Sequence, residues 1–121
     1  MTDLVDVAVQ QPRADVAVVE IKGEHDAATS AQLQQLLGGV VAQNDLIVVD
    51  LSQAEFIDSS VITALLRTHR AATERNKTFR LQFGTAPIVR RMLEISGLLE
   101  IIEQVSTREE ALATANADTL T

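Results

Sequence analysis

A carboxylate and two hydroxyls stand together at Asp58-Ser59-Ser60, directly before a stretch with the apolar spacing of an amphipathic helix. Asp or Ser in this position caps a helix by accepting hydrogen bonds from its first backbone N–H groups, which is worth about 1 kcal/mol. A serine there is also a candidate kinase acceptor, and a phosphate would add about −1.5 to −2 charges. The helix dipole and unpaired N–H groups favour such an anion, so it would change the surface and leave the fold intact. From these residues alone, a plain cap and a phosphorylation site on Ser59 both stay open.

Other residues that could carry chemistry do not form a recognisable catalytic or metal site. Asp50 ends an apolar segment, as the phosphoacceptor of a receiver domain does, but the acid pair and the later lysine that such a site needs are missing. His25 and His69 have no ligand spacing. A glycine-rich phosphate loop and a Gly-x-Ser-x-Gly elbow are also absent from the sequence. We therefore expect a binding protein rather than an enzyme, with no cofactor and no metal.

The composition is that of an acidic protein of one-domain size. The chain has 121 residues, a net charge of −7 and no cysteine, which excludes disulfides and thiol chemistry. An acidic protein repels nucleic acid, so no nucleic-acid partner is expected. There is no signal-peptide pattern, and no apolar run reaches the roughly 20 residues that span a bilayer. These observations predict a cytoplasmic protein without membrane insertion.

The basic residues are unevenly distributed along the chain. Seven of the ten Lys and Arg residues fall between Arg67 and Arg91. We favour a solvated helix face followed by a strand edge. The alternative is a basic patch that docks an acidic partner.

Apolar periodicity predicts an opening hairpin followed by alternating helices and strands. Strands are expected at residues 4–9, 16–21, 46–51 and 79–83, the last with one polar face, and a short fifth strand at Ile101-Ile102. The first two should be antiparallel across a turn at residues 10–15. Helices are expected after a cap at Asp26, after Ser60, from Pro87 to a glycine stop at Gly97, and over residues 107–117.

The order β-β-α-β-α-β-α-(β)-α indicates an α/β fold with a mixed, mostly parallel sheet of four or five strands and about four helices. A single domain is expected over residues 1–117, followed by a frayed tail at 118–121. In the helix after Ser60, an apolar side contains Val61, Ile62, Leu65, Leu66 and Ala72, and the opposite side contains Arg67, Thr68, Glu74 and Arg75.

Three ordered motifs resemble those of one known family. Residues 51–60, Leu-Ser-Gln-Ala-Glu-Phe-Ile-Asp-Ser-Ser, are similar to the signature of STAS domains, in particular of bacterial anti-sigma factor antagonists. Gly23-Glu24-His25-Asp26 resembles their turn before the first helix. Residues 89–98 resemble their late helix, which ends in Ser-Gly-Leu. The resemblance covers nearly the whole chain and implies a STAS-like domain.

The resemblance also implies a function. In that family the serine directly after the aspartate is phosphorylated by an anti-sigma factor serine kinase, which points to Ser59 here, with Ser60 as second choice. The unphosphorylated form binds the kinase, and a sigma factor is released to direct transcription. The kinase brings the ATP. The expected contact surface comprises Glu24, Asp26, Asp58, Ser59, Ser60 and Val61, on a protein that is a monomer or a weak dimer.

The chain departs from the family pattern directly after Ser60. The family usually continues with Gly-Leu-Gly, and this chain has Val61-Ile62-Thr63. Loss of two glycines narrows access around Ser59 and makes the helix start more apolar. The alternative hypothesis is therefore a constitutive STAS accessory subunit of a transporter or scaffold complex that is not regulated by phosphorylation.

Overall fold

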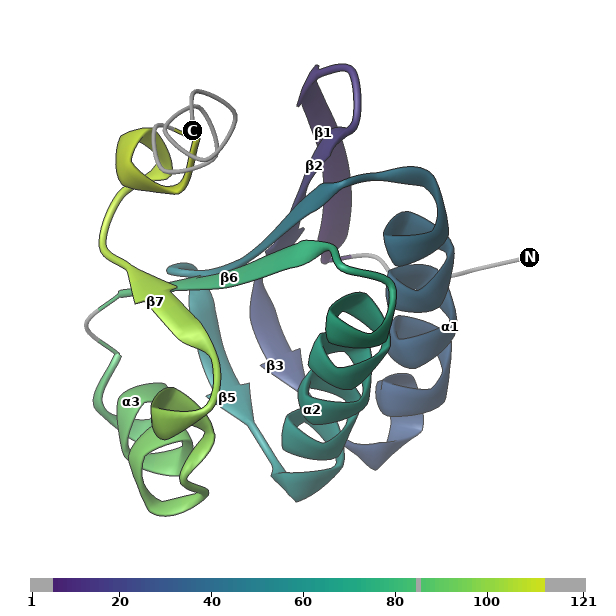
Figure 1. The fold of residues 1–121 in the computed structure, drawn as a ribbon. Coiled ribbons are helices and arrows are strands. Elements are labelled where there is room, and N and C mark those ends of the chain that lie inside the picture. Colours follow the sequence, from purple (N-terminus) through teal and green to yellow (C-terminus); the bar gives the residue numbers. More distant parts are fainter. Residues whose placement is uncertain (1–5, 85, 113–121) are drawn as a thin grey trace.

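The structure, a computed structural model, describes residues 6–84 and 86–112 and contains a mixed sheet flanked by helices (Figure 1). The larger sheet has five strands in the order β1-β2-β4-β6-β7. Their bounds are β1 Val7–Arg13, β2 Val16–Ile21, β4 Leu46–Leu51, β6 Thr78–Phe83 and β7 Glu103–Val105. The pair β1–β2 is antiparallel and the other neighbouring pairs are parallel. The predicted α/β class with a mostly parallel sheet is confirmed.

The opening hairpin is longer than the sequence pattern indicates. β1 continues through Pro12 to Arg13, where we expected a turn, and the chain reverses at Asp15, which has a φ of 66°. Proline is tolerated because β1 is an edge strand and its pairing is irregular between Gln10 and Arg13. The predicted strand positions 4 and 5 lie outside the described residues.

A second, two-stranded sheet is not predicted by the sequence pattern. It pairs β3, Gly23–His25, in parallel with β5, Ala54–Ile57. We expected a turn and a loop at these places. Strands of three and four residues are too short to show a clear alternation of apolar and polar residues, which explains why periodicity misses them.

Three helices follow in the predicted order: α1 Ala27–Gln43, α2 Ser59–Glu74 and α3 Pro87–Ile95. Figure 1 shows α1 and α2 packed side by side, while α3 packs against β5 and the short 3-10 helix η1, Leu98–Glu100. Gly97 has a φ of 76° and ends α3 as predicted. In α2, Thr68, which was expected on the polar side, is instead buried, and its hydroxyl is satisfied there by donating to the carbonyl of Ala64 at 2.7 Å.

The larger sheet buries alternate residues on opposite faces, as a pleated strand requires. One face joins the main core with the helices and includes Val19, Ile21, Ile47, Val49, Leu51, Phe79 and Leu81. The other face forms a smaller apolar cluster of Val16, Val18, Leu46, Val48 and Ala111. Ala111 comes from the end of the described chain, so the C-terminal segment covers this second face.

The polar residues of β6 lie on that second face too. The prediction of one polar face is right in placement, but Arg80 is only 2% exposed and Gln82 only 9%. The last strand is Glu103–Val105, two residues beyond the predicted Ile101-Ile102. Residues 108–112 are helical, which agrees with the start of the predicted helix. The rest of that helix and the predicted tail lie outside the described residues.

Candidate functional site

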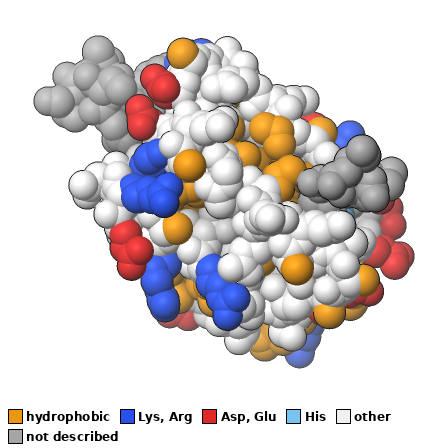
Figure 2. All heavy atoms as spheres, turned by 90° about the vertical axis from the view of Figure 1, so that its right-hand side faces the viewer, with side chains coloured by type: hydrophobic (Ala, Val, Ile, Leu, Met, Phe, Trp, Pro, Cys, Tyr) orange, Lys and Arg blue, Asp and Glu red, His pale blue; other side chains and the backbone are white. Residues whose placement is uncertain are grey.

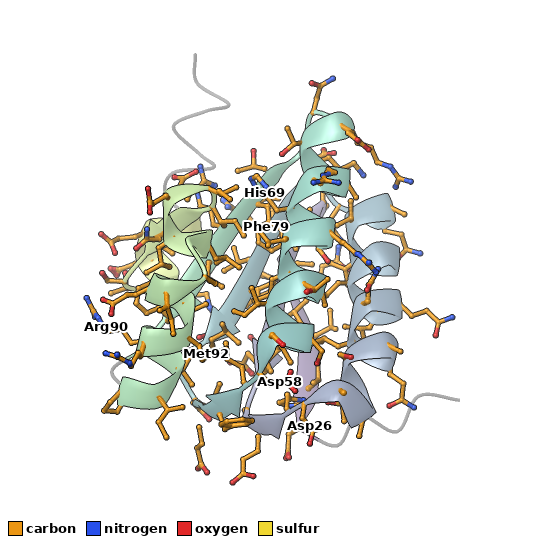
Figure 3. All side chains as sticks on the ribbon, turned by 90° about the horizontal axis from the view of Figure 1, so that it is seen from below. Asp26, Asp58, His69, Phe79, Arg90 and Met92 are labelled. Carbon is orange, nitrogen blue, oxygen red and sulfur yellow. The ribbon has the colours of Figure 1, made fainter. Side chains whose placement is uncertain are left out.

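The two-stranded sheet places two helix starts next to each other. β3 ends at His25 and β5 ends at Ile57, and these two residues are partners in the parallel register. The next residue along each chain segment, Asp26 or Asp58, is the N-cap of α1 or α2. Figure 3 shows both aspartates at the same end of the molecule. Asp26, Asp58 and the exposed Glu24 on β3 form an acidic edge. The paired strands β3 and β5, which the sequence pattern does not predict, bring these residues together.

Asp58 holds the start of α2 with one carboxylate oxygen. Its Oδ1 accepts from the backbone N–H of Ser60 at 2.9 Å and of Val61 at 3.3 Å, and from the Ser60 hydroxyl at 2.5 Å. The Ser60 hydroxyl is the main reason why the pKa of Asp58 is lowered, and the backbone amides of Val61, Ser60 and Ala27 add to this against the opposing effect of burial.

Ser59 and Ser60 have different environments although they are neighbours. Ser60 is half-buried, and its hydroxyl donates to Asp58. Ser59 is exposed at the first position of α2, and its hydroxyl makes no hydrogen bond within residues 6–84 and 86–112. Of the two, Ser59 therefore has the more accessible hydroxyl.

The amides at the start of α2 are already occupied. We expected a phosphate on Ser59 to meet unpaired N–H groups, and for Ser60 and Val61 this is wrong because the Asp58 carboxylate accepts both. The carboxylate thus takes the place that the helix dipole offers to an anion. A phosphate on Ser59 would project into solvent beside an existing negative charge.

The side chain of Val61 is buried and is not presented at the surface. Its side chain is 0% exposed and Ile62 is 5% exposed, and both pack in the main core. The expectation that Val61 touches a partner is therefore wrong for this structure. The same burial keeps the Val61 side chain away from Ser59. Thr63, at the family's second glycine position, is exposed, and its hydroxyl donates to the Ser59 carbonyl oxygen at 3.0 Å, so the expected narrowing can arise only from Thr63.

Phe56 is an exposed aromatic residue next to this edge, and the sequence interpretation does not include it in the expected contact surface. It is 39% exposed on β5 and lies opposite Glu24 in the register of the small sheet. Exposed aromatic side chains are enriched at protein interfaces. Two signals could have found it: its place two residues before Asp58, and the scarcity of aromatics, which make up 2% of the chain.

The basic run divides into separate environments. Arg67 and Arg70 are exposed on α2, and Arg75 is exposed at the C-cap that follows it. Arg80 is buried and pairs with Glu103 at 2.9 Å. On the face seen in Figure 2, Lys and Arg side chains are scattered among acidic, hydrophobic and other uncharged side chains. This distribution agrees with a solvated helix face better than with one basic patch.

The histidines have structural surroundings. His25 is 4% exposed, with Nε2 2.8 Å from the carbonyl oxygen of Lys22 and Nδ1 3.2 Å from the Thr29 hydroxyl, so it ties β3 to α1. His69 packs edge-on against Phe79, and burial lowers the pKa of its imidazole. The described part of the chain contains no group of three His, Cys, Asp or Glu residues that could hold a metal ion. No helix among these residues is long and apolar enough to cross a bilayer.

Comparison with known proteins gives a consistent picture. A family model described as "Mlab, STAS domain" matches residues 7–103. The chain is similar to the anti-sigma-F factor antagonist RsfB of Mycobacterium tuberculosis, with 36% identity over 101 residues, which are 80% of this chain and 79% of RsfB.

Solved structures are similar over most of the chain. An anti-sigma factor antagonist from Mycobacterium paratuberculosis is 29% identical with a TM-score of 0.79, and the match covers 89% of this chain and 91% of that one. The anti-sigma factor antagonist SpoIIAA in its unphosphorylated form has the same TM-score of 0.79 at 20% identity, and the match covers 92% of this chain and 96% of that one. The likeness to SpoIIAA establishes the fold.

Proposed function

The chain belongs to the STAS domain family, and from that premise we propose that it is an anti-sigma factor antagonist controlled by phosphorylation of Ser59. The unphosphorylated protein binds an anti-sigma factor serine kinase, and the phosphorylated protein releases it, so that sigma-factor-dependent transcription is regulated by partner exchange. The observation that carries this proposal is the exposed, unbonded hydroxyl of Ser59 beside the Asp58 cap. The similarity to RsfB, whose name describes an anti-sigma-F factor antagonist, supports the choice of partner class.

The release step follows from the charges at this edge. Ser59 directly follows Asp58, which lies at the same end of the molecule as Asp26 (Figure 3). Glu24 is exposed on β3, the strand paired with β5. A phosphate would add about −1.5 to −2 charges to this acidic edge. A partner that fits the unmodified surface would then meet like-charge repulsion or have to strip water from the phosphate. The protein acts as a binding module in this scheme, and the kinase supplies ATP and the catalysis.

Mass spectrometry after incubation with the cognate kinase and ATP tests the modification. We expect one phosphate on the wild-type protein and on Ser60→Ala, and none on Ser59→Ala. Ser60→Ala is the matched control, because it removes the neighbouring hydroxyl and leaves the Asp58 carboxylate in place. Phosphate on Ser60, or an unmodified wild-type protein, would contradict the proposal. Copurification from the native host identifies the kinase.

A second candidate function is a constitutive accessory subunit of a transporter or scaffold complex. It is favoured by Val61-Ile62-Thr63, which stand in place of the family's usual Gly-Leu-Gly. In that case the same edge would bind its partner permanently, and phosphorylation would be absent. Copurification of a transporter subunit, with binding unaffected by Ser59→Asp, would favour this function over the first.

Localisation and assembly belong to the proposal as well. We propose a cytoplasmic protein that is a monomer or a weak dimer and binds neither nucleic acid nor metal. The net charge of −7 supports the first exclusion. Sedimentation equilibrium over a hundredfold range of concentration would detect a stable dimer, which would contradict the assembly proposed here.

A further inference from the structure

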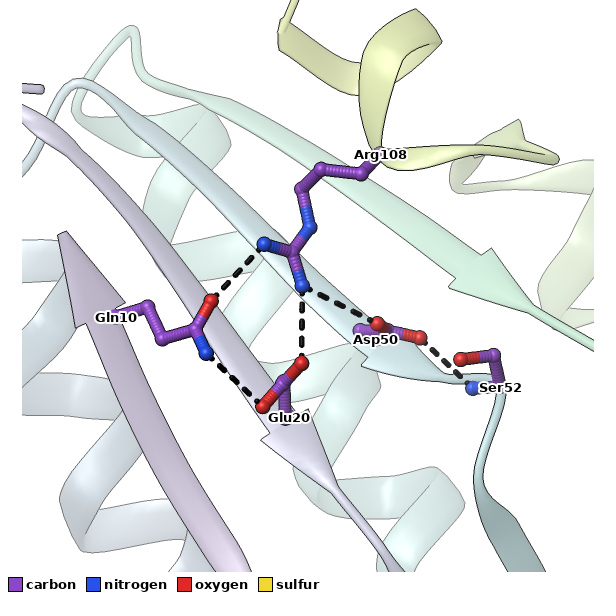
Figure 4. A network of polar contacts seen from close by, with 5 residues as sticks. All are labelled: Gln10, Glu20, Asp50, Ser52 and Arg108. Carbon is purple, nitrogen blue, oxygen red and sulfur yellow. Dashed lines mark hydrogen bonds and ion pairs between the residues drawn. The ribbon is translucent and has the colours of Figure 1, made fainter. Parts of the chain in front are cut away.

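The C-terminal segment lies on the face of the larger sheet opposite the main core. Figure 4 shows Arg108 reaching across this face to residues of β1, β2 and β4. Its Nη2 lies 3.0 Å from Oε2 of Glu20 and 3.5 Å from Oδ2 of Asp50, and its Nη1 donates to Oε1 of Gln10 at 2.9 Å. Ala111, one helical turn further on, is 0% exposed against the sheet. Charged and apolar contacts therefore hold the segment in place together.

Arg108 holds two carboxylates that would otherwise repel each other. Glu20 and Asp50 are partners in the parallel register of β2 and β4, so they stand side by side on one face. Their side chains are only 17% and 8% exposed. Repulsion between neighbouring carboxylates grows as water is excluded, and a guanidinium that contacts both offsets it. Without Arg108, Asp50 would be pushed from its present position.

Asp50 also holds the turn that leads to the candidate site. Its Oδ1 accepts from the backbone N–H of Ser52 at 2.8 Å (Figure 4). The same turn accepts a hydrogen bond at Gln53 from the backbone N–H of Gly23, at 3.1 Å. A Cβ built on Gly84 would lie 2.9 Å from the carbonyl oxygen of Ser52, so the end of β6 lies directly against the turn.

The turn leads directly, through β5, to the start of α2 with Asp58 and Ser59, which we call the Ser59 surface. Residue 54 begins β5, and β5 ends one residue before the Asp58 cap. The Gly23 contact joins the turn to β3 as well, whose end precedes Asp26. A displacement of Asp50 is thus passed to both strands that position the two helix starts.

We propose that Arg108 is a positioning residue for the Ser59 surface. By holding Asp50 it fixes the Ser52-Gln53 turn and β5, and the docked C-terminal segment thereby controls the order of the start of α2. The structural coupling requires no kinase. Its consequence for phosphorylation rests on the proposed function, because a disordered Ser59 surface can change the rate of phosphorylation only if Ser59 is phosphorylated.

Amide hydrogen exchange, measured by NMR on the full chain, tests the coupling. For Arg108→Gln we expect the amides of Ser52, Gly23 and Ser60 to exchange about tenfold faster, which corresponds to a local destabilisation of about 1.4 kcal/mol. The central β4 amides of Val48 and Val49 should keep their wild-type rates, because the change is a local opening. Equal acceleration of all slow amides would show a merely stabilising residue and overturn the proposal, as would wild-type rates throughout.

Two further variants separate this route from a general effect of charge. Arg70→Gln removes the same charge from the exposed side of α2 and should leave the Ser52 rate unchanged. Arg108→Lys keeps a cation and should restore part of the protection. If Arg70→Gln accelerates Ser52 as much as Arg108→Gln does, net charge is the cause and the positioning role is wrong.

A double-variant cycle identifies Asp50 as the intermediate. Asp50→Asn keeps an oxygen for the Ser52 N–H and loses the ion pair, so adding Arg108→Gln to it should accelerate Ser52 exchange no further. Additive effects would show that Arg108 acts by another route and would overturn the proposal. The exchange data stand independently of the mass spectra, so a failure of the coupling and a failure of the proposed phosphorylation are distinguishable.

Discussion

Asp58 accepts a hydrogen bond from the hydroxyl of Ser60 at 2.5 Å, and this bond gives two neighbouring serines different roles. The Ser60 hydroxyl is committed to the helix cap and is half-buried, whereas Ser59 is exposed. The group that fixes the helix start is therefore distinct from the group that solvent can reach. A covalent change at Ser59 would alter the charge of the surface without removing the hydrogen bonds that hold α2.

The two helix caps should differ in their contribution to stability. Asp58→Ala loses two amide hydrogen bonds and the acceptor of the Ser60 hydroxyl, so we expect the free energy of unfolding to fall by about 1–2 kcal/mol. Asp26→Ala is the matched control. Its Oδ1 accepts from the Ala28 amide and it is exposed, so about 0.5–1 kcal/mol is expected. Urea unfolding measures both, and a larger loss for Asp26→Ala would contradict this ranking.

The Asp58 cap should also produce a defined dependence of stability on pH. Its pKa in the folded protein is lowered from the ordinary value of 3.8, mainly by the Ser60 hydroxyl. The contribution is therefore complete above the unfolded pKa and is lost as the pH falls through the lower, folded pKa. We expect the stability difference between wild type and Asp58→Asn to be constant near neutral pH and to shrink below about pH 4. A difference that grows on acidification would contradict the sign.

Gly38 and Gly84 should respond to alanine in opposite directions. A Cβ on Gly38 meets nothing within 4 Å inside α1, so Gly38→Ala should raise the free energy of unfolding by about 0.5–1 kcal/mol. A Cβ on Gly84 would lie 2.9 Å from the Ser52 backbone oxygen, and Gly84→Ala should therefore destabilise the protein. Urea unfolding under identical conditions checks the pair. A stabilising Gly84→Ala would show that the turn at Ser52 yields easily.

Long, periodic elements could be predicted from the sequence because burial imposes their pattern directly. β2 and β4 have the predicted bounds. On α1, the expected apolar residues Leu33, Leu37 and Val41 face the protein core. The small sheet could not be predicted in this way. Its strands are held by pairing between segments about 30 residues apart, as in the register of Gly23 with Ala54, and such pairing leaves no periodic trace in either segment.

The candidate site shows the same division between local and long-range information. The Asp58 cap is local, since a carboxylate before an amphipathic stretch is a sufficient signal. The burial of Val61 and Arg80 is not local. Val61 faces the core, and Arg80 is covered by elements that arrive later in the chain, with Glu103 as an ion-pair partner 23 residues away. The long-range network around Arg108 is likewise invisible in a single sequence.

Phe56 should contribute to partner binding and little to folding. Its side chain is 39% exposed beside the Asp58 cap, so Phe56→Ala should leave the circular dichroism spectrum unchanged. If the small sheet forms part of the interface, we expect Phe56→Ala to weaken the free energy of binding to the copurified kinase by more than about 1 kcal/mol. Ile95→Ala, at a residue 67% exposed at the end of α3, is the control and should bind like the wild type. An unchanged affinity for Phe56→Ala would place the interface elsewhere.

A charge at position 59 should weaken partner binding more than loss of the hydroxyl does. Ser59→Asp adds a negative charge beside Asp58. In an isothermal titration with the kinase, we expect the Ser59→Asp variant to bind about tenfold more weakly than the Ser59→Ala variant does. Thr73→Asp places the same charge near the other end of α2 and should bind like the wild type. The deficit of Ser59→Asp should also diminish as the ionic strength rises, because salt screens exposed charges. Equal affinities of Ser59→Asp and Ser59→Ala at low salt would show that repulsion plays no part in the release of the partner.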